Sequence, residues 1–236
     1  MAQATIRQNP EASPRVILVG EEKTPVIIIN DFATDTSELI RYAVNSASFA
    51  LDTASYYPGV RAETPSGYLQ EIVRVIVPLL GKVYSVPRGR KLRRNASYSL
   101  VATPPEELQI PQRIPHFDSN SKYFFAMTHY LNEGEFGGTG LFRHKPTGFE
   151  NVSDNRLQEY FHAVEAFAAA HGDPPAEYIR ESSDQYERYM SIDYQPNRLV
   201  AYPGSLLHSG LISPERDVNA DPAAGRLTCN SFVHFQ

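Results

Sequence analysis

A histidine and a carboxylate two residues apart are the first residues in this sequence with the chemistry of a metal site. His116 and Asp118 flank Phe117, and in an extended strand such a pair projects from one face. Two histidines and one carboxylate on one side of Fe(II) leave three positions open for oxygen chemistry. The same His-x-Asp pattern also arises when a histidine lies in a turn and the aspartate caps a helix, without any metal. The pair therefore predicts half of an iron site, and the other ligand must come from elsewhere.

The best candidate for the missing ligand is His208, which follows a turn and a short apolar pair. Residues 203–205 read Pro-Gly-Ser and residues 206–207 are both leucine. Such a turn can lead into a returning strand. A strand that returns here brings His208 against His116 and Asp118.

Composition limits the class of protein. The 236 residues carry a formal net charge of -5, which gives no electrostatic reason to expect nucleic acid or an anionic membrane as a partner. The single cysteine, Cys229, cannot form an internal disulfide, and the first 15 residues lack the apolar core of a signal peptide. No apolar run approaches the length of a membrane span. We expect a cytoplasmic protein, and the sequence does not indicate its oligomeric state.

The chain divides into a short arm and one domain. Residues 1–14 are polar and contain proline, so we expect a flexible N-terminal arm. Residues 15–236 are expected to form a single domain, because barrels commonly use this length as one unit. In it, residues 15–94 would supply N-terminal strands and supporting helices, and residues 95–236 the core.

Two short strands and a helix are predicted at the start of the domain. Residues 15–19 and 26–29 are rich in β-branched side chains and flank a charged turn. Thr34 or Asp35 can cap the helix that follows. Its buried stripe would consist of Leu39, Tyr42, Ala43 and Phe49.

A second helix is predicted after a turn-rich loop at residues 56–61. Ser66 can cap this helix, and Pro78 should kink or end it. The basic run at residues 88–94 has no interleaved aromatic residues, which favours a solvated strand edge or loop over a nucleic-acid site. The apolar positions of the helix are Leu69, Ile72, Val73, Ile76 and Leu80.

Beyond residue 95 the pattern is mainly that of short strands. Glycine, proline and asparagine turns between them favour a sandwich or barrel over a parallel sheet. Residues 154–170 show helical periodicity, and a tyrosine-rich helical piece at residues 178–190 is expected to complete a helical insertion of about residues 150–195. The predicted strands are residues 96–102, 123–131, 140–144, 198–202 and 227–235.

Five segments in the same order give this half of the chain a family resemblance. It resembles the 2-oxoglutarate- and Fe(II)-dependent dioxygenases of the prolyl-hydroxylase-like kind, which implies a double-stranded β-helix core, also called a jelly roll or cupin-like fold. More narrowly, it resembles a bacterial domain-of-unknown-function group, so the substrate is not supplied. A weaker echo lies at residues 57–61. The five segments are residues 116–118, 127–132, 137–142, 197–208 and 225–228.

The resemblance implies an iron site at three residues. It makes His116, Asp118 and His208 the ligands of Fe(II). The implied activity uses O2 and 2-oxoglutarate, releases succinate and CO2, and most simply hydroxylates a small-molecule or peptide substrate.

The resemblance also implies a site for the far carboxylate of 2-oxoglutarate. It makes Arg226 the partner of that carboxylate, and a guanidinium suits this role because it stays charged and donates two hydrogen bonds in a planar fork. Thr228 lies two residues further on, so its hydroxyl shares a strand face with Arg226. Tyr130 is placed where family members often bind the same carboxylate.

Two other functions stay open from the sequence. A non-catalytic jelly roll would keep the fold and bind a carbohydrate or a partner. A cupin-type metalloenzyme would use the three ligands without 2-oxoglutarate, and it would not need Arg226 and Thr228.

The remaining candidate side chains favour structural roles. Among the other histidines only His144 is expected near substrate. Cys229 is expected in the barrel wall, because nothing near it in sequence would lower its thiol pKa. The histidines with expected structural or surface roles are His129, His162, His171 and His234.

Overall fold

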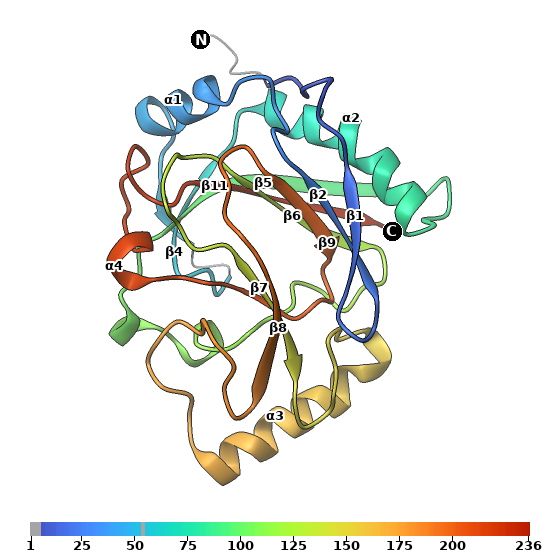
Figure 1. Ribbon diagram of the computed structural model, residues 1–236, viewed down its shortest axis with the longest axis vertical. Coiled ribbons are helices and arrows are strands. Elements are labelled where there is room, and N and C mark those ends of the chain that lie inside the picture. The colour runs from blue at the N-terminus through green and yellow to red at the C-terminus, as the bar shows by residue number, and fades with distance from the viewer. Residues whose placement is uncertain (1–5, 53–54) are drawn as a thin grey trace.

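Two antiparallel sheets that face each other across a cavity form the core of the protein (Figure 1). The computed structural model describes residues 6–52 and 55–236. The large sheet consists, in spatial order, of β1 (Arg15–Val19), β2 (Thr24–Ile29), β9 (Leu199–Pro203), β6 (Phe124–Tyr130), β11 (Thr228–Phe235), β5 (Leu92–Val101), β4 (Gly59–Glu63) and β3 (Ala50–Leu51). The small sheet consists of β10 (His208–Gly210), β7 (Thr139–His144) and β8 (Tyr186–Ile192).

This topology confirms the predicted mainly β, jelly-roll class of fold. Neighbours in the large sheet come from distant parts of the chain, with β9 between β2 and β6 and β11 between β6 and β5. The strands predicted beyond residue 95 agree with β6, β7, β9 and β11 to within one residue. Strand β5 begins at Leu92, four residues before its predicted start, so the exposed basic run at residues 88–94 ends on a strand.

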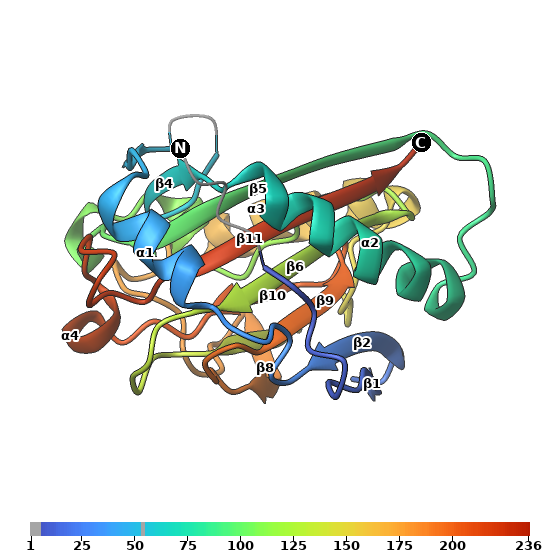
Figure 2. The same ribbon diagram turned by 90° about the horizontal axis from the view of Figure 1, so that it is seen from above.

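Two helices cover the outer face of the large sheet, α1 (Ser37–Asn45) and α2 (Ser66–Val83) (Figures 1 and 2). Their buried side chains recur along one side of each helix, as an amphipathic helix requires. In α2 the spacing is four residues, and the sheet supplies the opposing apolar side chains from β5, β6 and β11. The fully buried residues of α2 are Tyr68, Ile72, Ile76 and Leu80.

Helix α2 continues past the proline that was predicted to kink or end it. Pro78 lies inside the helix, which ends at Val83. A proline removes one backbone hydrogen bond, but Ile76 and Leu80 on either side are fully buried against the sheet. Tertiary packing therefore extends the helix where local sequence would stop it.

A third helix covers the small sheet. Helix α3 (Leu157–His171) lies beside β7 and β8 (Figure 1). Tyr160 of α3 packs with Phe142 and Tyr186, and the hydroxyls of Tyr160 and Tyr186 form a 3.0 Å hydrogen bond. This helix was predicted from its periodicity.

The second half of the predicted helical insertion is wrong. Residues 178–190 do not form a helix, and Tyr186–Ile192 is strand β8, which pairs antiparallel with β7. Tyr186 and Ile192 are buried at the two ends of this strand. Aromatic and branched side chains fit a half-buried sheet, so pairing with β7 overrides the helical spacing.

The chain start and one loop also differ from expectation. Residues 6–14 do not form a free arm, because Ile6 is 4% exposed in the core and the backbone N–H of Gln8 donates to Glu71 at 2.6 Å. The prediction for residues 1–5 lies outside the described residues.

Part of the expected loop at residues 56–61 is strand β4, which pairs with β5. Gly59 makes this close pairing feasible, since a Cβ there would lie 2.1 Å from the carbonyl oxygen of Leu100.

The packing of α2 on the large sheet predicts a large loss of stability when a buried side chain of this helix is shortened. We expect Ile72→Ala to lower the free energy of unfolding by about 2–5 kcal/mol, because it removes buried methyl groups and leaves a cavity. Gln70→Ala, on the exposed side of the same helix, should change it by less than about 0.5 kcal/mol. Urea unfolding followed by circular dichroism measures both, and equal small effects would contradict this packing.

A buried histidine on the face of the large sheet that packs against α2 makes the stability of the protein depend on pH. His129 is 0% exposed, and its ring contacts those of Phe32 and Tyr68. Its Nε2–H donates to the Asn197 side-chain oxygen at 3.1 Å. Burial lowers the pKa of His129 from 6.5 to about 4, so between these values the unfolded chain binds a proton that the folded chain does not.

We therefore expect stability to fall as the pH drops from 6.5 towards 4. The histidine accounts for roughly 3 kcal/mol of this loss. His129→Gln keeps an amide donor and removes the titration, so its stability should change less over this range. Urea midpoints at several pH values measure the slope, and identical slopes for the two proteins would refute the assignment.

Candidate metal centre

The three predicted ligands are positioned by two chain segments that pair with each other. His116 and His208 form an isolated antiparallel bridge, in which each backbone N–H donates to the other's carbonyl oxygen at 2.9 Å. The backbone N–H of Asp118 donates to the carbonyl oxygen of Gly204 at 2.7 Å. Strand β10 carries His208 and is itself paired with β7. Backbone hydrogen bonds therefore fix the Cα positions of all three residues.

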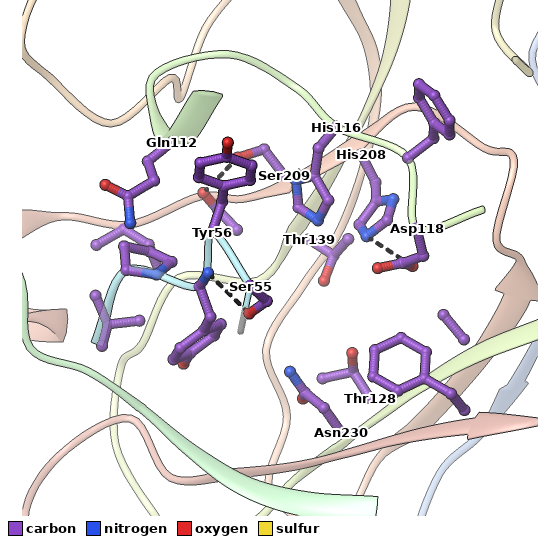
Figure 3. Close-up of a pocket in the computed structure, with 18 of the residues that line it drawn as sticks. Ser55, Tyr56, Gln112, His116, Asp118, Thr128, Thr139, His208, Ser209 and Asn230 are labelled. Carbon is purple, nitrogen blue, oxygen red and sulfur yellow. Dashed lines mark hydrogen bonds and ion pairs between the residues drawn. The ribbon is translucent and has the colours of Figure 1, made fainter. Parts of the chain in front are cut away.

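Their side chains converge on one point (Figure 3). One potential ligand atom from each of His116, Asp118 and His208 lies within 4.8 Å of the other two. The Nε2 atom of His208 is 3.6 Å from Oδ2 of Asp118. Its Nδ1 lies 2.8 Å from the carbonyl oxygen of Leu206, which accepts a hydrogen bond and leaves Nε2 free to bind a metal.

The electrostatics of this cluster favour a cation. Burial, and then the neighbouring His208, hold the pKa of His116 well below its ordinary value, although one side of the ring faces the cavity. Burial raises the pKa of Asp118, and His208 and Arg61 oppose that rise. Within the described residues, Oδ2 of Asp118 has no hydrogen-bond partner. Two imidazoles and a carboxylate whose Oδ2 lacks a hydrogen bond are a donor set that suits a divalent metal.

The cluster opens into a cavity of about 610 Å³ between the two sheets. Both the large sheet and the small sheet contribute to its wall, and so do the segments at residues 55–61 and 111–118. Figure 3 shows six polar residues of the wall beside the three candidate ligands: Ser55, Gln112, Thr128, Thr139, Ser209 and Asn230.

Arg226 lies in the wall of this cavity and is 5% exposed. Its Nε donates to the carbonyl oxygen of Gly137 at 2.6 Å, and its Nη2 lies 3.4 Å from that of Gly138. The guanidinium also lies over the rings of Tyr130 and Tyr194, 5.5 and 5.8 Å from their centroids. These contacts fix one edge of the guanidinium.

The other two residues predicted to bind 2-oxoglutarate lie behind this wall. The Tyr130 hydroxyl forms a 2.7 Å hydrogen bond with that of Thr139, and Thr139 lines the cavity. The Thr228 hydroxyl lies 3.1 Å from the side-chain oxygen of Asn230 and 3.4 Å from the carbonyl oxygen of Ser99. Neither Tyr130 nor Thr228 is part of the cavity lining.

The sequence did not single out two further cavity residues, Tyr57 and Arg61. Arg61 lies on β4 and pairs with Asp52 at 2.9 Å. The only sequence signal for either residue was the weak family echo at residues 57–61. The sequence predicted a loop at residues 56–61. In the structure Arg61 lies on strand β4, and its side chain lines the cavity.

The other candidate side chains lie elsewhere. His144, the histidine expected near substrate, is not in the cavity lining, and its ring nitrogens contact Thr147 and Gln185. Cys229 is fully buried on the outer face of the large sheet. Both positions are structural.

The chain belongs to the family of unknown function DUF6445, whose model matches residues 10–233. No curated protein sequence matches it. Within residues 6–52 and 55–236, every helix is too short or too polar to cross a membrane.

Among solved structures, the chain is similar to HygX from Streptomyces hygroscopicus with nickel, 2-oxoglutarate and hygromycin B bound, at 10% identity and a TM-score of 0.47. That alignment covers 91% of this chain and 84% of HygX. HygX with nickel and 2-oxoglutarate aligns over the same shares at 11% identity and a TM-score of 0.42. A bsmA homologue from Methylobium petroleophilum gives 11% identity and a TM-score of 0.31, over 96% of this chain and 77% of the homologue.

The unpartnered carboxylate predicts opposite effects of one substitution on stability and on metal binding. We expect Asp118→Asn to stabilise the metal-free protein by about 1–3 kcal/mol, because it removes a buried carboxylate charge that the nearby His208 and Arg61 offset only in part. The same change should weaken binding of Fe(II) or Ni(II) by more than about a hundredfold, since losing a partner of a ligand already costs 10–100-fold.

Thermal unfolding with and without metal, together with calorimetric metal titration, measures both effects. Glu187→Gln, a surface carboxylate paired with Arg143, is the control. A metal affinity that Asp118→Asn leaves unchanged would contradict the assignment of the site.

Proposed function

We propose that this protein is an Fe(II)- and 2-oxoglutarate-dependent oxygenase that hydroxylates a small-molecule or peptide substrate and releases succinate and CO2. The observation that carries the proposal is the combination of two features in one cavity. His116, Asp118 and His208 converge there with potential ligand atoms within 4.8 Å of one another, and the buried guanidinium of Arg226 lies in the same wall.

The three ligands would hold Fe(II) on one side only. His116 and His208 come from paired segments, and Asp118 lies beside them, so these three residues would hold the metal from the side of the paired segments. The opposite side faces the cavity. When bound, iron and 2-oxoglutarate supply the activation of O2 and the oxidation of a C–H bond, while the protein supplies orientation and a cavity.

Arg226 would bind the far carboxylate of 2-oxoglutarate. The carbonyl oxygens of Gly137 and Gly138 orient its guanidinium, and Tyr130 and Tyr194 flank it. A guanidinium keeps its charge when buried, which a lysine does not do reliably. In this arrangement Tyr130 acts by holding Thr139 and packing on the guanidinium, and Thr228 supports the strand that follows Arg226.

The substrate would occupy the rest of the cavity. Amide and hydroxyl groups from Thr128 and Asn230 lie on the large sheet, and the rings of Phe124, Tyr202 and Phe232 add apolar surface. A wall of this kind suits a polar organic molecule or a side chain of a peptide.

Anaerobic titration tests the proposal. Protein loaded with Fe(II) should develop a weak visible charge-transfer band when 2-oxoglutarate is added, and then release succinate with candidate substrates under O2. Iron binding without this band would favour a cupin-type metalloenzyme. Failure to bind iron would favour a non-catalytic jelly roll.

The charge of Arg226 predicts a specific loss of co-substrate affinity. We expect Arg226→Gln to raise the Kd for 2-oxoglutarate by about a hundredfold or more, because it removes charge-assisted hydrogen bonds of about 1.5–3 kcal/mol each. The Kd for Fe(II) should stay within about twofold. Arg74→Gln, which removes a surface ion pair with Glu71, should change neither constant, and an unchanged 2-oxoglutarate Kd in Arg226→Gln would rule out this role.

A further inference from the structure

Two buried donors in the cavity that Arg226 lines lack acceptors. The Tyr57 hydroxyl and Nε of Arg61 are both buried, and neither has a hydrogen-bond partner among the residues that the structure describes. Tyr57, Arg61 and Arg226 all line the cavity of the metal cluster. Buried donors without acceptors cost stability, so their presence in the lining of a cavity indicates that a ligand completes them.

The Tyr57 ring is held in place by Arg61. The guanidinium carbon of Arg61 lies 4.5 Å from the ring centroid of Tyr57. On its other side, Nη1 of Arg61 pairs with Oδ2 of Asp52 at 2.9 Å. The guanidinium is thus fixed between a carboxylate and an aromatic ring, and it restricts where the Tyr57 hydroxyl can point.

The Tyr57 hydroxyl lies within the influence of both arginines. Burial raises its pKa, and the positive charges of Arg226 and then Arg61 oppose the rise. The Ser99 hydroxyl lies beside it, without a hydrogen bond of ordinary geometry between the two. At neutral pH Tyr57 keeps its proton and is a donor, and the positive charge of Arg226 favours an anionic acceptor for it.

Strand register puts these groups at one level of the large sheet. Arg61 on β4 lies opposite Ser99 on β5, and Ser99 lies opposite Thr228 on β11. Thr228 in turn lies opposite Tyr130 on β6. The donors near Tyr57 therefore share one row of the sheet with the residues that flank Arg226.

We propose that the Tyr57 hydroxyl donates a hydrogen bond to the far carboxylate of 2-oxoglutarate, next to Arg226, and that Arg61 is a positioning residue that holds the Tyr57 ring. This assignment rests on the proposed function and adds a binding residue from the N-terminal part of the chain. A carboxylate has two oxygens, so Arg226 and Tyr57 can each donate to one of them.

A pair of 2-oxo acids separates this role from a general effect on the cavity. 2-Oxobutyrate keeps the metal-chelating oxo acid and lacks the far carboxylate of 2-oxoglutarate. In anaerobic titrations of the Fe(II) protein, followed by the visible charge-transfer band, we expect Tyr57→Phe to raise the Kd for 2-oxoglutarate about tenfold. The Kd for 2-oxobutyrate should stay within about twofold.

A neighbouring tyrosine is the matched control. Tyr178 also lines the cavity, but its hydroxyl already donates to the carbonyl oxygen of Thr103 at 2.6 Å. Tyr178→Phe should leave the affinity for both oxo acids unchanged. If Tyr57→Phe leaves 2-oxoglutarate affinity intact, or weakens both oxo acids equally, the assignment is wrong. If the wild type shows no band with either acid, the proposed function itself fails and this assignment with it.

A double substitution tests the positioning role of Arg61. Since Arg61 acts through Tyr57, Arg61→Met should weaken 2-oxoglutarate binding in the wild type. In the Tyr57→Phe background it should add no more than about a further twofold. Independent, multiplicative losses would show that Arg61 binds the co-substrate or another group directly, and would overturn the positioning role.

Discussion

The pairing of two distant segments is the constraint on which the rest of this structure depends. The bridge between His116 and His208 joins two segments that are separated along the chain by β6, β7, α3, β8 and β9. It closes the cavity on one side and places the potential ligand atoms next to each other. The large sheet forms the opposite wall, so both the metal cluster and Arg226 face the same space.

The cavity concentrates polar groups that the protein itself does not satisfy. Buried atoms without hydrogen-bond partners occur at Asp118, Tyr57 and Arg61, all in the lining, and at Ser99 behind it. The carboxylate of Asp118 suits a cation, and the donors Tyr57 and Arg61 suit an anion. Such atoms cost stability in the empty protein, and binding of a metal and a carboxylate, as proposed, would restore it.

The sequence predicted those parts of the fold and site that depend on local pattern. The strands of the core follow apolar and β-branched runs, and His116, Asp118 and His208, whose side chains converge, were singled out from residue types and their order along the chain. Wherever tertiary packing decides, the sequence was less informative. Pro78 sits inside a helix because the flanking residues are buried, and Tyr186–Ile192 is a strand because β7 offers a partner. Arg61 was missed because its direction depends on a strand pairing made possible by Gly59.

The central claim is that His116, Asp118 and His208 bind one iron ion. A crystal structure of the protein loaded anaerobically with Fe(II), with anomalous data at the iron absorption edge, tests it most directly. The account predicts a single strong peak about 2 Å from a nitrogen of each histidine and an oxygen of Asp118, with its remaining positions facing the cavity. Iron bound elsewhere, or coordinated without one of these three side chains, would contradict the account.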